Sequence, residues 1–135
     1  MKRFLSVLVL SILMVSLLTA AAPVPVTTFT LVQGLPPVMN VGDVYTVVVQ
    51  VTSDQQFVSA SALPSFQYAG KGVVAVQGGD RQGSGTSATL QITFKAKSAT
   101  ARMTDGVAPV YVVVGVRYGG GYVATQEYLF PVRVP

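Results

Sequence analysis

Residues 86–97 read TSATLQITFKAK, and this stretch decides the fold class. Apolar and polar residues alternate through it without a break. Successive side chains of a β-strand point to opposite faces, so the pattern predicts a strand with one buried and one solvent-facing side, as in an antiparallel sheet. The predicted buried set is Ala88, Leu90, Ile92, Phe94 and Ala96.

Similar alternation recurs on both sides of this strand. Residues 44–52 read VYTVVVQVT, which predicts a strand with Tyr45, Val47, Val49 and Val51 on one face. Residues 110–118 and 122–134 flank Gly119-Gly120-Gly121, which predicts a β-hairpin with a glycine tip. Weaker patterns predict strands at 26–32, 57–63, 65–69 and 72–77.

Polar and glycine-rich stretches separate these strands. The strand pattern is interrupted at 33–37. The other expected connections are a turn at 40–43, a polar loop at 53–56, a flexible loop at 78–85 and a longer loop at 98–109. Pro131 and Pro135 predict that the last strand lies partly at a sheet edge, where a missing N–H is tolerated. Seven or eight strands, with no sustained helical pattern, predict two packed antiparallel sheets.

The first 22 residues have the layout of an export signal. Lys2 and Arg3 precede the apolar run FLSVLVLSILMVSLL at 4–18, and small residues follow at 19–22. This layout predicts a secretory signal peptide cleaved after Ala21 or Ala22. The alternative is an uncleaved membrane anchor, because 4–22 is just long enough to span a bilayer. Both predict a domain at 23–135 that is extracellular or at the cell surface.

Three motifs support a family resemblance. Val41-Gly42-Asp43 precedes the strand at 44–52, GTSATLQITF occupies 85–94, and PVYVVV at 109–114 follows Gly106. In this order they resemble the immunoglobulin-like repeats of prokaryotic surface proteins, including S-layer-associated and adhesion-related domains. The resemblance covers about 41–134 and implies an immunoglobulin-like β-sandwich with a non-catalytic role. It carries over no functional residues. We expect one such unit without a C-terminal anchor, which would be a departure from such proteins.

Residue types argue against catalysis. The chain has no histidine and no cysteine, which removes the usual nucleophile pairs, the common zinc ligands and disulfides. We expect no enzyme activity, no cofactor and no metal site. A calcium site built from loop aspartates is the weaker alternative. The five acids are Asp43, Asp54, Asp80, Asp105 and Glu127; the aspartates are expected in or beside turns and Glu127 on an outward strand face.

Partners are predicted from composition and two tyrosines. Basic residues are scattered, which argues against nucleic-acid binding. Tyr118 and Tyr122 flank the glycine tip and could form a contact tip; the favoured alternative is a cross-strand aromatic pair that closes the hairpin.

The low charge, the export signal and the lack of recognisable catalytic or metal-binding residues predict a structural or adhesive surface module. It would assemble with copies of itself or with a cell-surface protein. A concrete form is strand exchange, in which 24–32 leaves its own domain and 33–37 acts as the hinge. A polysaccharide- or protein-binding module without self-assembly is the alternative. The membrane would be contacted only through an uncleaved N-terminal segment.

Overall fold

The computed structural model describes residues 23–64 and 72–135, and in them the chain forms eight β-strands and two 3₁₀ turns. The predicted signal segment and the strand expected at 65–69 lie outside the described residues. The elements are β1 (Thr27–Gln33), β2 (Val44–Phe57), β3 (Ser59–Pro64), β4 (Val74–Gly78), β5 (Asp80–Gln82), β6 (Gly85–Ala96), η1 (Thr104–Gly106), β7 (Ala108–Arg117), η2 (Gly119–Gly121) and β8 (Val123–Val132).

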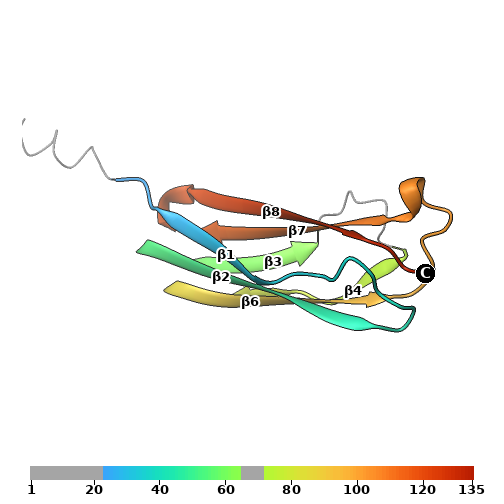
Figure 1. Cartoon of the computed structure of the whole chain (residues 1–135). Helices are drawn as coiled ribbons and strands as arrows, with labels where there is room; N and C mark the ends of the chain where they lie inside the picture. The colour runs from blue at the N-terminus through green and yellow to red at the C-terminus, as the bar shows by residue number, and fades with distance from the viewer. Residues whose placement is uncertain (1–22, 65–71) are drawn as a thin grey trace, which may run out of the picture.

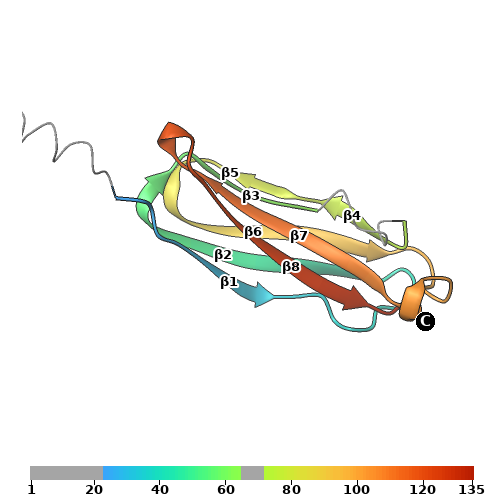
Figure 2. The same ribbon diagram turned by 90° about the horizontal axis from the view of Figure 1, so that it is seen from above.

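The strands form two antiparallel four-stranded sheets. One has the order β1-β2-β6-β4 and the other β5-β3-β7-β8. Figure 1 shows the two sheets stacked face to face. In the view from above, β1 and β8 run along one long side of the sandwich, and β4 and β5 lie towards the other (Figure 2). The orders β1-β2-β6-β4 and β3-β7-β8 are those of an immunoglobulin-like sandwich, with β5 added beside β3, so the predicted sandwich of two antiparallel sheets is confirmed.

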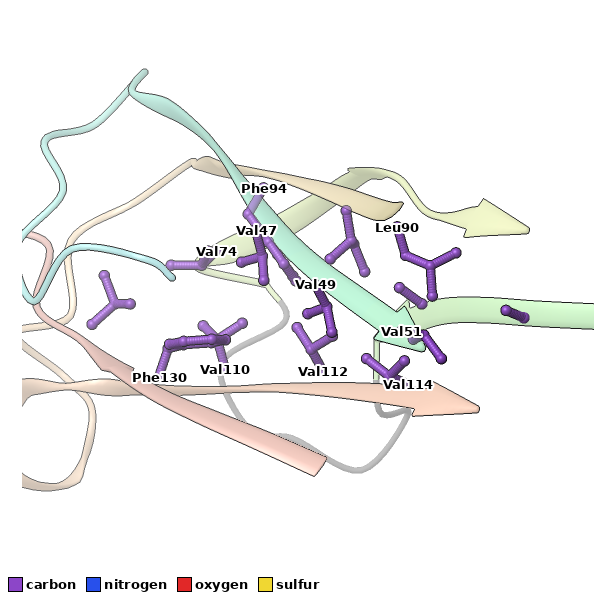
Figure 3. Close-up of a cluster of buried hydrophobic side chains, with 14 of the residues drawn as sticks. Val47, Val49, Val51, Val74, Leu90, Phe94, Val110, Val112, Val114 and Phe130 are labelled. Atoms are coloured by element: carbon purple, nitrogen blue, oxygen red, sulfur yellow. The ribbon is translucent and has the colours of Figure 1, made fainter. Parts of the chain in front are cut away.

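Apolar side chains, most of them valines, fill the space between the sheets (Figure 3). Strands β2, β6 and β7 contribute alternate residues to the core, as the alternation at 44–52 and 86–97 predicts. Burying each of these side chains stabilises the fold by about 1.5–3 kcal/mol. Fully buried members are Val47, Val49, Val51, Leu90, Ile92, Phe94, Val110, Val112 and Val114.

The polar loop predicted at 53–56 is wrong, because β2 continues through these residues to Phe57. Ser53 pairs with Thr27 of β1, and the Asp54 N–H donates to the Val26 carbonyl oxygen at 3.3 Å. A neighbouring strand thus supplies hydrogen-bond partners that make an extended conformation favourable for a polar sequence.

The flexible loop predicted at 78–85 is also wrong, because it contains β5. The chain leaves the β1-β2-β6-β4 sheet at the end of β4 and joins β3 in the other sheet as β5. Gly79 lies at this crossing. A Cβ atom there would stand 2.9 Å from the Ala62 carbonyl oxygen, so only glycine fits without a backbone shift.

The C-terminal hairpin and the edge position of β8 are confirmed. Gly120 and Gly121 have φ angles of 82° and 91°, which glycine adopts without strain. Just beyond β8, Arg133 forms a parallel bridge with Val38, so the segment that follows β1 joins the end of β8. Within 23–64 and 72–135, no helix has the length and apolar character needed to cross a membrane.

Candidate functional site: the open edge of β1

β1 is the outermost strand of its sheet, and half of its backbone groups face away from β2. The bond from Asp54 N–H to the Val26 carbonyl makes these two residues a hydrogen-bonded pair of the ladder. Hydrogen-bonded and non-hydrogen-bonded pairs alternate along an antiparallel ladder. Every second residue of β1 therefore points its N–H and C=O outward. We call these groups, on Thr27, Phe29 and Leu31, the β1 edge.

No strand of the described chain lies beyond the β1 edge. The opposite side of the same sheet is closed differently. There, β4 covers only one end of β6, and side chains of β5 cover the next backbone groups. The Asp80 carboxylate accepts from Gln91 N–H at 3.0 Å, and the Gln82 amide donates to the Thr89 carbonyl at 2.6 Å. No comparable side-chain cover is present at the β1 edge among the described residues.

The β1 edge also lacks charge. No charged residue occurs from position 23 to position 42. Edge strands usually carry lysines, prolines or bulges that discourage pairing with another chain. Here Pro25 precedes the strand, and a register shift between Leu31 and Gln33 ends its regular pairing. These two features bound a short, neutral and open stretch.

The edge of β8 is open as well over part of its length, but it differs in two ways. It carries the exposed carboxylate of Glu127, on an outward position as predicted. Just past the end of β8, the Arg133 N–H is already occupied, because it donates to the Pro37 carbonyl oxygen at 2.9 Å. On the inner face of β8, Tyr128 stacks on Phe130 with ring centroids 6.4 Å apart, and desolvation raises the pKa of the Tyr128 phenol.

Tyr118 fastens the N-terminal end of β1 to the rest of the sandwich. Its side chain is only 3% exposed. Its hydroxyl donates to the Ser53 hydroxyl at 2.7 Å and shares a 2.6 Å hydrogen bond with the Thr27 hydroxyl. One phenol group thus joins β1, β2 and the end of β7. The Gln55 amide adds a 3.0 Å bond to the Pro23 carbonyl, just before β1.

The two tyrosines singled out from the sequence therefore differ in accessibility. Their ring centroids are 5.8 Å apart with planes tilted by 47°, an arrangement that fits a cross-strand aromatic pair. Tyr122 is 44% exposed, whereas Tyr118 is buried. Of the two, Tyr122 alone can reach a partner, and its contact role stays a prediction.

Three of the four aspartates accept hydrogen bonds from backbone N–H groups. The Asp43 carboxylate accepts from Asn40 N–H at 2.8 Å in the predicted turn. Asp54 and Asp80 lie in strands instead of turns, and each accepts from a backbone N–H of another segment. Asp105 sits in η1 with a φ of 58°. Within the described residues, no group of three metal-ligating side chains gathers.

The fold and this edge together define an immunoglobulin-like β-sandwich with a neutral outermost strand whose outer edge is unpaired in the described part of the chain. No family model matches the chain, and no curated protein matches it. Among solved structures, E. coli alpha-2-macroglobulin in its native conformation is 18% identical, with a TM-score of 0.46 over 85% of this chain. Murine CRIg is 12% identical, with a TM-score of 0.38 over 81% of this chain and 98% of its own. The chain spans only 7% of the alpha-2-macroglobulin chain.

Proposed function

We propose that this protein is an extracellular, non-enzymatic structural or adhesive module that assembles with copies of itself by exchange of β1. The observation that carries the proposal is the position of β1: it is a neutral outermost strand with five of its seven residues exposed. Export to the cell surface is supported by the layout of residues 1–22. A non-catalytic role is supported by the absence of histidine and cysteine.

The contacts of β1 suit an exchange between copies. β1 pairs with β2 and leaves the other edge of its backbone free. In an exchanged assembly, β1 makes the same contacts with β2 of a neighbour, so little is lost once the strand is released. Phe29 is the residue of β1 that packs against the core, and it marks where the exchanged strand would anchor.

The stretch predicted as a hinge lies between two fixed points. Residues 34–37 belong to no strand. Beyond them, Arg133 N–H donates to the Pro37 carbonyl at 2.9 Å, and Met39 N–H donates to the Arg133 carbonyl at 3.0 Å. The chain is thus held from Pro37 onwards while β1 can depart from Gly34. Domain swapping depends on such a connection between a detachable strand and a fixed body.

A disulfide lock tests the proposal. Thr28 and Thr52 are exposed register partners, and a hydrogen-bonded antiparallel pair has Cα atoms about 5.5 Å apart, within the range for a disulfide. The chain has no native cysteine, so Thr28→Cys/Thr52→Cys forms only this bridge. Light scattering of residues 23–135 should show chains of exchanged copies for the parent and the reduced variant. The variant oxidised as monomer should form no such chains. Identical particles before and after oxidation would contradict strand exchange.

The alternative is a polysaccharide-binding module, and it depends on exposed aromatics. Tyr122 supports it, but the burial of Tyr118 removes the second ring of the tip. A glycan array in which Tyr122→Ala abolishes binding would favour this function over assembly.

A further inference from the structure

We infer that β1 is also an edge for direct pairing of two copies, in which the β1 strands lie antiparallel about a two-fold axis at Phe29. The two β1-β2-β6-β4 sheets then become one continuous eight-stranded sheet. This inference deepens the proposed self-assembly, but it requires no exchange, because each β1 keeps its own pairing with β2.

The first argument is the near-palindromic sequence of the strand. Residues 26–32 read VTTFTLV. A two-fold antiparallel pairing about Phe29 sets Val26 opposite Val32 of the second copy and Thr28 opposite Thr30 of the second copy. An isologous interface uses the same patch on both copies, so it demands this kind of self-complementarity. Like residues meet at each of these steps.

The second argument is the phase of the backbone groups. The outward residues Thr27, Phe29 and Leu31 fall opposite outward residues of the second copy in the same register. Thr27 faces Leu31, and Phe29 faces its own counterpart. Each facing pair can exchange two hydrogen bonds, about six in total. At the next outward position Pro25 has no N–H, so the ladder ends there.

The third argument is exposure and charge. Val26 is 63% exposed and Val32 is 60% exposed, and the proposed register places these two side chains against each other on one face. Because residues 23–42 carry no charge, the pairing brings no like charges together. Addition of a strand to a sheet edge draws its affinity from main-chain hydrogen bonds of this kind.

Charge and edge cover favour β1 over β8 for this contact. Both strands lie along the same long side of the sandwich (Figure 2). The β8 edge carries the exposed carboxylate of Glu127, and the backbone just past its end is bonded to Pro37 and Met39, whereas the β1 edge is neutral and uncovered. The far side of the same sheet is closed by Asp80 and Gln82. A ladder of seven residues per copy falls short of the roughly 20–30 residues per side of a standard interface, so we expect a reversible, concentration-dependent dimer.

The oxidised Thr28→Cys/Thr52→Cys protein separates this contact from strand exchange. Its β1 is tied to β2 and cannot leave, whereas its outer edge is unchanged. Sedimentation equilibrium over a range of concentrations should show a monomer–dimer equilibrium for the locked protein. A locked protein that stays monomeric throughout would overturn edge pairing while leaving strand exchange standing. A locked dimer with no higher assembly in the unlocked protein would do the reverse.

Charge pairs in the locked protein test the register. Val26→Lys/Val32→Lys and Val26→Glu/Val32→Glu each place like charges opposite one another at both ends of the ladder. Val26→Lys/Val32→Glu places opposite charges there at the same exposed positions. We expect both like-charge variants to weaken dimerisation about tenfold or more relative to the mixed variant. Because the two like-charge variants shift net charge in opposite directions, a common loss is a register effect. Equal dimerisation of all three variants would refute the register.

Discussion

At the scale of single residues, one phenol hydroxyl links β1 to the rest of the sandwich. Tyr118 is buried beneath the hairpin tip, and its hydroxyl reaches Thr27 of β1 and Ser53 of β2. Its ring also meets Phe57 edge-on, with centroids 6.5 Å apart. A tyrosine beside a glycine tip reads as surface in the sequence, but here it joins three strands.

Replacing Tyr118 by Phe should therefore destabilise the protein and loosen β1. The variant keeps the ring packing but loses both hydrogen bonds, which costs about 1–3 kcal/mol when the partners are left unpaired. Chemical denaturation measures the loss of stability. Relative to the parent protein, amide hydrogen exchange should become faster in β1 by a larger factor than in β6. Tyr122→Phe is the matched control. Its ring is exposed and its hydroxyl makes no hydrogen bond within the described part of the chain, so the change should alter stability by less than about 0.5 kcal/mol. Equal losses in the two variants would show that the hydroxyl bonds contribute nothing.

At the scale of elements, the two long sides of the sandwich differ in how their backbone groups are covered. On one side the chain crosses from β4 to β5, and the side chains of β5 satisfy exposed groups of β6. On the other side, β1 and β8 present open backbone. The crossing depends on Gly79, where the backbone passes close to β3.

Gly79→Ala should disturb this crossing, whereas Gly78→Ala should not. A Cβ at Gly79 would lie 2.9 Å from a backbone oxygen and 3.3 Å from a Leu63 side-chain atom, and the backbone cannot move away without shifting β3. A Cβ at Gly78 meets nothing within 4 Å. We expect a loss of about 1–3 kcal/mol for the first variant and less than about 0.5 kcal/mol for the second, measured by thermal unfolding. Equal stability of both would mean that β5 is not held as described.

At the scale of the whole molecule, both sheets share one hydrophobic core. Side chains of β2 and β6 face those of β7 and β3 across this core (Figure 3). A shared core makes the sheets unfold together, so we expect a single cooperative transition.

Leu90→Ala should lower the free energy of unfolding by about 2–5 kcal/mol in that one transition, because Leu90 is fully buried and alanine leaves a cavity. Leu129→Ala removes the same atoms from an exposed position on β8 and should cost less than about 0.5 kcal/mol. Urea denaturation followed by two spectroscopic probes measures both. Separate transitions for the two probes would contradict a shared core.

The sequence by itself determined the fold class, most strand positions and which side chains of these strands face the core. These properties depend on local alternation, since a residue's face in a strand follows from its parity. The stretch at 86–97 predicts five core residues, and all five are buried in β6. The hairpin at Gly119-Gly120-Gly121 and the edge position of β8 were predictable for the same local reasons.

Only the tertiary structure decided which strands lie at the edges and how each edge is finished. Residues 53–56 and 80–82 are polar, so their strand conformation depends on partners that are distant in the sequence. The burial of Tyr118 and the use of Asp54 and Asp80 as backbone acceptors likewise depend on neighbouring strands. The neutral run at 26–32 is visible in the sequence. Which of its backbone groups point outward depends on its register with β2. Alternation along one strand does not identify the neighbouring strand, so the sequence could not predict these groups.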